Sequence, residues 1–133
     1  MNRTFVDTSA IIGLLDADDP RHENVRNAFA AHASDDLVTH GYVVAESIAV
    51  ARRRLGVDGA IAVIDDVLPA LELLPVDVSL HAIALARYRE SLPSGTSFVD
   101  QVSLAVMANA SIHTALVLDS DFAAAGITVI PNP

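Results

Sequence analysis

The sequence predicts a three-layer α/β fold, in which a mainly parallel β-sheet is covered by helices on both faces. Short apolar segments alternate with longer segments of helical periodicity along the whole chain, a pattern typical of β–α units that build a parallel sheet. Hydrophobic residues make up 52% of the 133 positions, which is enough for one well-formed core. Because no linker, repeat or low-complexity segment interrupts the pattern, residues 1–133 are predicted to form a single domain.

The first part of the chain is predicted to contain two strands, each followed by helices. Phe5 and Val6 favour an extended strand, and Asp7 ends their apolar run where a helix begins. Pro20 has the fixed φ that suits the first turn of a second helix. The elements expected here are a strand at 3–7, helices at 8–15 and from residue 20, a strand at 37–39 and a helix at 42–55, which ends at Gly56.

The remaining elements are bounded by proline, by a capping motif and by glycine. Pro69 ends an amphipathic helix. Ser97 and Asp100 have the spacing of a capping box, with Asp in place of the usual Glu or Gln. The elements expected here are a helix at 58–68, a strand at 71–74, helices at 79–91 and from residue 97, a strand at 115–118, a short helix at 122–125 and a strand at 127–130.

The charged residues exclude several classes of protein. The chain has a net charge of -9, no Lys and no Cys, which rules out a disulfide framework, a thiolate metal site and any mechanism that needs a lysine amine. Such an acidic protein does not bind nucleic acid by overall charge alone. No secretory signal is visible, and the uncharged segment 101–118 contains enough polar residues to indicate a buried helix and strand rather than a membrane span. A soluble cytoplasmic protein is therefore expected.

Several acidic residues are predicted to meet at one edge of the sheet. Asp7 and Asp119 each follow an apolar strand, and the carboxyl ends of parallel strands open on the same edge. Asp100 lies in the first turn of its helix, and Glu46 lies early in its own helix. The last third of the chain carries no other formal charge than those of Asp100, Asp119 and Asp121.

Carboxylates brought together repel one another unless a cation lies between them. With oxygen ligands only, the expected cation is a hard divalent ion, Mg²⁺ or Mn²⁺. Ions of this kind typically serve phosphate chemistry, in which they activate water and stabilise a leaving oxygen. The five histidines have no spacing that favours a zinc site.

Each acidic residue also has a simpler structural explanation when it is taken alone. Asp7 and Asp100 can cap helices, Asp121 can stabilise a turn, and Glu46 can pair with Arg52 or His40. The other aspartates in loops and on polar helix faces are expected to be solvated; they are Asp16, Asp18, Asp19, Asp35, Asp36, Asp65 and Asp66.

Four motifs in this order resemble the PIN-domain ribonucleases, and among them the VapC toxins of bacterial toxin–antitoxin pairs. The motifs are FVDTSA at 5–10, VVAES at 43–47, SFVDQVSLAVMA at 97–108 and VLDSDF at 117–122. The resemblance covers essentially the whole chain. It implies a parallel sheet with helices on both sides, hydrolysis of single-stranded or loop RNA to 5′-phosphate and 3′-hydroxyl ends, a homodimer, and inhibition by a cognate antitoxin.

The resemblance also implies a set of site residues. The implied ligands of Mg²⁺ or Mn²⁺, which also form the catalytic set, are Asp7, Glu46, Asp100 and Asp119, with Asp121 adjacent. Ser9, and also Thr8, would orient a ligand or a bound water. Some relatives carry another acid one turn after the Asp of the third motif, where this chain has Ser103 or Leu104. Whether Asp119 or Asp121 binds the metal directly is therefore left open.

The only basic cluster of the chain is the triplet Arg52, Arg53 and Arg54. These side chains are candidates for binding RNA phosphates, as are Arg87 and Arg89. An equally good explanation for the triplet is a favourable interaction with the carboxyl end of its helix.

The function predicted from these observations is metal-assisted hydrolysis of RNA, in which water activated by the bound ion attacks phosphorus. One alternative is a non-catalytic PIN-like module that binds RNA or protein, but all four acidic positions are filled. A second alternative is phosphoryl transfer through an aspartyl phosphate on Asp7. This alternative is weaker because the enzymes concerned rely on a Lys, which the chain lacks.

Overall fold

The computed structural model describes residues 2–119 and 121–132. Its centre is a five-stranded sheet in the order β3-β2-β1-β4-β5, in which every neighbouring pair is parallel. This result confirms the predicted fold class. The strands are β1 Arg3–Val6, β2 Asp36–His40, β3 Glu72–Leu74, β4 Thr114–Leu116 and β5 Thr128–Ile130.

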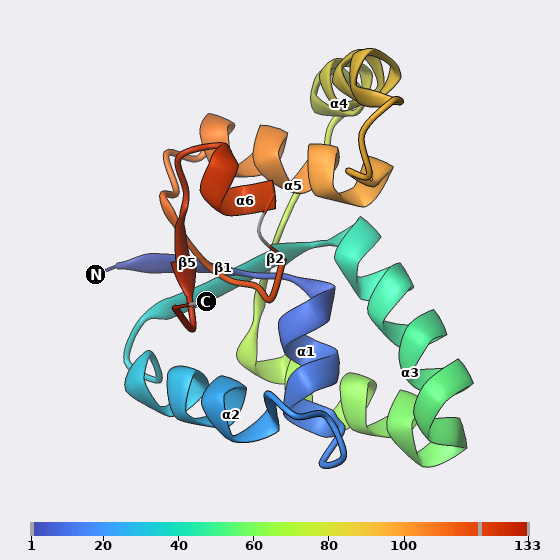
Figure 1. Cartoon of the computed structure of the whole chain (residues 1–133), viewed down its shortest axis with the longest axis vertical. Coiled ribbons are helices and arrows are strands. Elements are labelled where there is room, and N and C mark those ends of the chain that lie inside the picture. Colours follow the sequence, from blue (N-terminus) through green and yellow to red (C-terminus); the bar gives the residue numbers. More distant parts are fainter. Residues whose placement is uncertain (1, 120, 133) are drawn as a thin grey trace.

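Helices cover both faces of this sheet (Figure 1). In that view, α1, α2 and α3 lie below the sheet, and α5 and α6 lie above it, with α4 packed on the outer side of α5. The helices are α1 Thr8–Leu15, α2 His22–Ala31, α3 Gly41–Ala62, α4 Val78–Ser91, α5 Phe98–Asn109 and α6 Asp121–Ala124, with a π-helical turn Val63–Val67 and a 3₁₀ turn Leu68–Ala70 between α3 and β3.

The central strand β1 lies where the strand order changes direction. Phe5 is in register with Val38 of β2 on one side and with Ala115 of β4 on the other. The chain connections therefore leave this point toward opposite edges of the sheet. In open parallel sheets, ligands bind beyond the carboxyl ends of the strands at such a switch point, which here is the position of Asp7 and of the segment that follows β4.

The core is built on β1. Phe5 is fully buried, and its ring stacks on His40 at 5.6 Å and on Phe122 at 6.3 Å between centroids. A second, smaller cluster holds α4 against α5; its buried members are Leu80, Ala84, Val102, Ala105 and Val106. Among the described helices, none is long and apolar enough to cross a membrane.

The predicted solvation of seven aspartates is right for Asp18, Asp36, Asp65 and Asp66, which are exposed. Asp16, Asp19 and Asp35 are instead half-buried. The Asp35 side chain is only 16% exposed because Thr4 Oγ1 donates to it at 3.0 Å and His32 Nδ1 lies 2.7 Å away. The Asp19 side chain is 17% exposed and lies beside Arg21. His32 and Arg21 are close to their partners in the sequence, whereas the Thr4 contact joins residues 31 positions apart and depends on the pairing of β1 with β2.

Gly56 ends the first part of α3, as predicted, but the chain continues as a helix after a kink. Its φ of 76° and ψ of -164° lie in a region that is essentially restricted to glycine. The segment after the kink, expected as a helix at 58–68, instead completes α3 and then forms the π-helical and 3₁₀ turns.

We expect Gly56→Ala to lower the free energy of unfolding by about 1–3 kcal/mol, because a side chain is strained at this φ and ψ. Gly41→Ala is the matched control. Gly41 begins α3, has open space around a new Cβ and does not need a positive φ, so alanine there should be neutral or slightly stabilising. Urea unfolding of both variants measures the difference. Equal effects of the two substitutions would show that the kink is not strained by a side chain.

His40 joins β2 to α3 and is fully buried. Its Nδ1 accepts hydrogen bonds from the backbone N–H groups of Tyr42 and Val43 at 3.2 and 3.4 Å, which caps the helix. Ser103 Oγ donates to the carbonyl of Val99 at 3.0 Å, so His40 Nε2–H donates to Ser103 Oγ at 2.8 Å. The neutral ring therefore satisfies both of its nitrogens, and burial lowers its pKa from 6.5 to about 4.

This lowered pKa makes stability depend on pH. Between pH 6.5 and about 4 the unfolded chain binds a proton at His40 that the folded chain does not bind, so stability falls as the pH falls through this range. We expect the His40 titration to lower the free energy of unfolding by about 3 kcal/mol between pH 7 and pH 4, since one pKa unit corresponds to about 1.4 kcal/mol. His40→Asn keeps a capping oxygen but does not titrate. The difference in free energy of unfolding between this variant and the wild type should therefore shrink from pH 7 to pH 4. A constant difference would show that His40 is not the source of the pH dependence.

Candidate functional site

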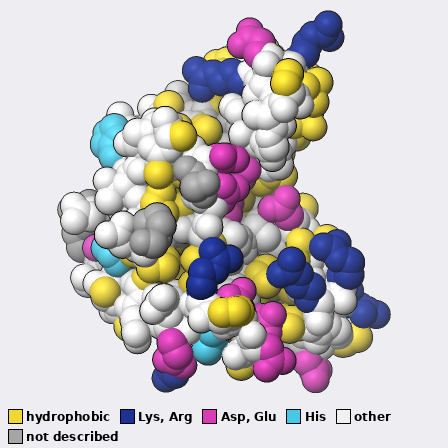
Figure 2. Space-filling model, in the orientation of Figure 1, with side chains coloured by type: hydrophobic (Ala, Val, Ile, Leu, Met, Phe, Trp, Pro, Cys, Tyr) yellow, Lys and Arg dark blue, Asp and Glu magenta, His cyan; other side chains and the backbone are white. Residues whose placement is uncertain are grey.

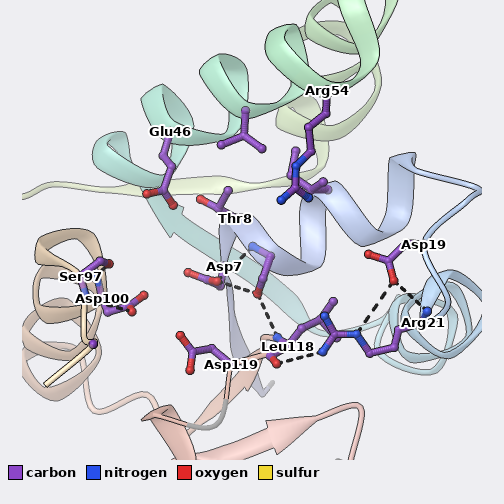
Figure 3. A pocket seen from close by; sticks show the side chains of 14 residues that line it. Asp7, Thr8, Asp19, Arg21, Glu46, Arg54, Ser97, Asp100, Leu118 and Asp119 are labelled. Carbon is purple, nitrogen blue, oxygen red and sulfur yellow. Dashed lines mark hydrogen bonds and ion pairs between the residues drawn. The ribbon is translucent and has the colours of Figure 1, made fainter.

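A cavity of about 400 Å³ lies beyond the carboxyl ends of β1 and β4. The four acidic residues predicted as the metal ligands all line it, although they come from four different parts of the chain. Figure 3 shows the side chains of Asp7, Glu46, Asp100 and Asp119 around this cavity. In Figure 2 acidic side chains gather in the hollow between α3 and the part formed by α4 and α5.

Asp7 is placed at this edge by the sheet and by the helix that follows. Its backbone N–H donates to the carbonyl of Leu116 at 3.0 Å, which extends the pairing of β1 with β4 by one residue. Its Oδ2 accepts hydrogen bonds from Ser9 N at 3.1 Å and from Ser9 Oγ at 2.7 Å, so Asp7 also caps α1. Asp7 therefore both caps α1 and lines the cavity.

The two residues after Asp7 connect it to neighbouring elements. Ser9 Oγ accepts a hydrogen bond from Leu118 N at 2.9 Å, so one hydroxyl links the Asp7 carboxylate to the segment that leaves β4. Ser47 Oγ of α3 donates to Thr8 Oγ1 at 3.3 Å. Thr8 and Ser9 thus hold Asp7 against both α3 and β4, which is an orienting position.

The other oxygen of the Asp7 carboxylate, Oδ1, is buried and has no hydrogen-bond partner among the described residues. Burial raises the pKa of Asp7, and the nearby Glu46 carboxylate raises it further, while the Ser9 hydrogen bonds oppose this change. A buried acceptor without a partner is costly to the fold. Asp7 Oδ1 is therefore an acceptor for which the described residues supply no donor.

Asp100 lies in the first turn of α5, where Ser97 and Asp100 form the predicted capping box. Ser97 Oγ accepts from Asp100 N at 3.1 Å, and Asp100 Oδ2 accepts from Ser97 N at 3.4 Å. The residue is 9% exposed. Burial raises its pKa to about 7, and the carboxylates of Asp7 and Asp119 add to this effect. In the absence of a cation, Asp100 therefore keeps its proton to a higher pH than an ordinary carboxyl group does.

Asp119 and Asp121 both lie near Asp100. Ligand oxygens of these three residues lie within 4.8 Å of one another, a spacing that could hold a metal ion. Asp119 Oδ1 accepts from Asp121 N at 2.9 Å, and Asp121 Oδ2 accepts from Thr96 Oγ1 at 3.3 Å. Of the two, Asp119 lines the cavity together with Asp7 and Glu46.

Glu46 and the arginine triplet share α3. Within the described part of the chain, Glu46 forms no ion pair, so neither Arg52 nor His40 neutralises it. Arg54 lines the cavity, whereas Arg52 and Arg53 are exposed and are not among its lining residues. All three arginines lie in the last turns before the kink at Gly56, so a helix-dipole contribution is compatible with their positions.

Asp19 and Arg21 also line the cavity, and the sequence did not indicate either of them. Arg21 Nη1 donates to the carbonyl of Leu118 at 3.2 Å, a contact between residues 97 positions apart. Its Nε lies 3.9 Å from Asp19 Oδ1. No periodicity reveals such a contact, because both residues lie in the turn before α2, outside any regular element.

The sequence matches the PIN domain family over residues 4–127, and the chain belongs to this family. Within it, the chain is similar to VapC20 of Mycobacterium tuberculosis, described as a sarcin–ricin loop cleaving toxin. The identity is 30%, the alignment covers 94% of this chain and 96% of that one, and the TM-score is 0.85. These matches confirm the predicted resemblance to VapC-type PIN toxins.

More distant structures share the fold. The FitAcB structure from Neisseria gonorrhoeae matches with 21% identity and a TM-score of 0.72, covering 95% of each chain. The DNA-bound VapBC structure from Salmonella typhimurium matches with 19% identity and a TM-score of 0.70, covering 97% of each chain. No curated protein matches the sequence.

Proposed function

We propose that this protein is a metal-dependent endoribonuclease toxin that hydrolyses RNA phosphodiester bonds and is neutralised by a cognate antitoxin. The observation that carries the proposal is the convergence of Asp7, Glu46, Asp100 and Asp119 on one cavity in a PIN-domain chain. Four carboxylates on separate elements are not needed to stabilise a fold. Their mutual repulsion instead calls for a cation.

The residues at the cavity fit a divalent ion. Asp7 Oδ1 is a buried acceptor with no partner among the described residues, and the donor set consists of carboxylate oxygens, which favour Mg²⁺ or Mn²⁺. Asp7, Glu46, Asp100 and Asp119 would hold the ion. The backbone N–H of Asp121 donates a hydrogen bond to the Asp119 carboxylate and would orient it toward the ion.

The chain's own residues prepare this site for hydrolysis. A bound divalent ion supplies Lewis acidity, which activates water and neutralises charge on the phosphate. Ser9 holds Asp7 Oδ2 with two hydrogen bonds, so that Oδ1 faces its ligand in one orientation. Asp100, whose pKa is raised by burial, would release its proton to the solvent when the ion binds. The fixed orientation of the Asp7 carboxylate avoids its rearrangement during the reaction.

Two other functions are less well supported. A non-catalytic PIN-like module that binds RNA or protein would not need the four acids to be retained around one cavity. An aspartyl-phosphate phosphotransferase would use Asp7 as a nucleophile beside a Lys, and the chain has no Lys.

The proposed partners are RNA, a cognate antitoxin and a second copy of this chain. The antitoxin is supported by the structural likeness to VapBC of Salmonella typhimurium, a toxin–antitoxin complex. The homodimer follows from the resemblance to VapC toxins alone. A cytoplasmic location is proposed because an RNA substrate is found there. VapC20 cleaves the sarcin–ricin loop, so this loop is the first RNA to test.

The test is cleavage of RNA by the purified protein. We expect cleavage of a sarcin–ricin loop RNA or of total RNA with Mg²⁺ or Mn²⁺, none with EDTA, and products that carry 5′-phosphates. Sequencing of the new 5′ ends would identify the target. A folded protein that binds RNA but does not cut it with either ion would favour the non-catalytic module instead.

A further inference from the structure

Two arginines lie in the cavity without a role in holding a cation. Arg54 reaches it from α3, and Arg21 reaches it from the turn before α2. In Figure 3 both lie toward the α2 side of the cavity, whereas Glu46 and Asp100 lie toward the α5 side. The end with Glu46 and Asp100 is therefore acidic. The opposite end holds Arg54 and Arg21 with the single carboxylate of Asp19, so it is basic on balance, in a protein with a net charge of -9.

Arg54 has no ion-pair or hydrogen-bond partner within residues 2–119 and 121–132. This is notable because five carboxylates line the same cavity; they are Asp7, Asp19, Glu46, Asp100 and Asp119. A guanidinium has five N–H donors in a planar fork that matches a phosphate. The unpaired Arg54 fork is therefore available to an anion that enters the cavity.

Arg21 is held in place by contacts that leave part of its fork free. Its Nη1 donates to the carbonyl of Leu118, and its Nε lies near Asp19 Oδ1. The Arg21 backbone N–H also donates to Asp19 Oδ1 at 2.8 Å. The contacts of Nη1 and Nε hold the guanidinium beside Leu118, in the segment that follows β4. The side chain is still 54% exposed, so its remaining N–H groups can reach a ligand.

We propose that Arg54, assisted by Arg21, binds the RNA phosphate next to the one that is cleaved, so that the strand crosses the cavity from its basic end to its acidic end. This inference rests on the proposed function. A negatively charged protein needs a local cationic contact to hold a polyanion such as RNA. Arg54 and Arg21 are the cationic side chains that line this cavity. The assignment separates Arg54 from its neighbours Arg52 and Arg53, which lie outside.

Arg54→Gln tests the proposal, with Arg53→Gln as the matched control. Both variants change the net charge equally on the same helix, and both residues are exposed, so folding should be unaffected. We expect Arg54→Gln to raise KM about tenfold, the effect of losing one charge-assisted hydrogen bond, with kcat within about twofold. The slope of log KM against log salt should fall by about 0.7, the value for one phosphate contact on a single strand. Arg53→Gln should change neither KM nor the slope by a comparable amount.

Arg21→Lys, which keeps the charge but loses the fork, should raise KM less than Arg54→Gln. Equal effects of Arg54→Gln and Arg53→Gln, or a loss of kcat at unchanged KM, would overturn the assignment. RNA binding by fluorescence anisotropy, measured in parallel, separates the two proposals. A protein that binds RNA through Arg54 without cutting it would contradict the nuclease function and support the arginine site. Cleavage that does not depend on Arg54 would support the nuclease function and contradict the arginine site.

Discussion

Replacing Asp7 by Asn is expected to lower RNA cleavage by about a thousandfold or more, because it removes a charged ligand from the site where the cation acts. The fold should be retained. The amide oxygen of Asn can accept the two Ser9 hydrogen bonds that Asp7 Oδ2 accepts now, and the neutral side chain is less costly to bury. Initial rates of cleavage and thermal unfolding, measured on the same preparation, check both parts.

Asp65→Asn is the control for this experiment, since Asp65 is exposed and lies outside the cavity. It makes the same chemical change and should leave the rate unaltered. Metal-dependent cleavage by Asp7→Asn at a rate near that of the wild type would reject Asp7 as a ligand, however well the variant folds.

Asp100→Asn is expected to change the pH dependence of stability. The pKa of Asp100 is about 7 in the fold and 3.8 when unperturbed, so between these values the folded chain holds a proton that the unfolded chain has lost. Stability therefore falls as the pH rises from about 4 to 7. The fall amounts to about 4 kcal/mol for this group, at about 1.4 kcal/mol per pKa unit. The Asn variant does not titrate, so it should be the more stable protein at pH 8 without metal.

Unfolding of wild type and Asp100→Asn at pH 5 and pH 8, in EDTA, measures this difference. The opposite dependence that His40 causes is present in both proteins and cancels in the comparison. Added Mn²⁺ should stabilise the wild type at pH 8 far more than the variant, because ligands that bind only the folded state stabilise it. A stability difference that is the same at both pH values would show that ionisation of Asp100 does not destabilise the fold.

The fold was predictable because its elements follow local rules. The apolar runs that form β1 and β4 are short and end at acids, and the capping box at Ser97 and Asp100 marks the start of α5. Glycine at position 56 correctly marked a helix boundary. It did not reveal that the chain resumes as a helix and then as a π-helical turn, because that depends on packing rather than on propensity.

The acidic part of the site was predictable for a topological reason. Strand ends of a parallel sheet share one edge, which brings Asp7 and Asp119 to the same cavity. The basic part was not. Arg21 enters the site from a turn through a contact with Leu118, and Arg54 is distinguished from Arg52 and Arg53 only by the direction in which its side chain leaves α3. Such contacts depend on tertiary structure, for which a single sequence gives no local signal.

We expect one divalent ion to be bound by Asp7 together with Asp119. Oxygens of Asp100, Asp119 and Asp121 lie within 4.8 Å of one another, so a cation held by those three alone is the competing arrangement. A crystal structure with Mn²⁺, located by its anomalous scattering, distinguishes the two. We predict a peak within about 2.3 Å of Asp7 Oδ1 and of an Asp119 oxygen, a normal oxygen–metal distance. A peak bonded to Asp100, Asp119 and Asp121 but not to Asp7 would show that Asp7 is not a ligand of the ion.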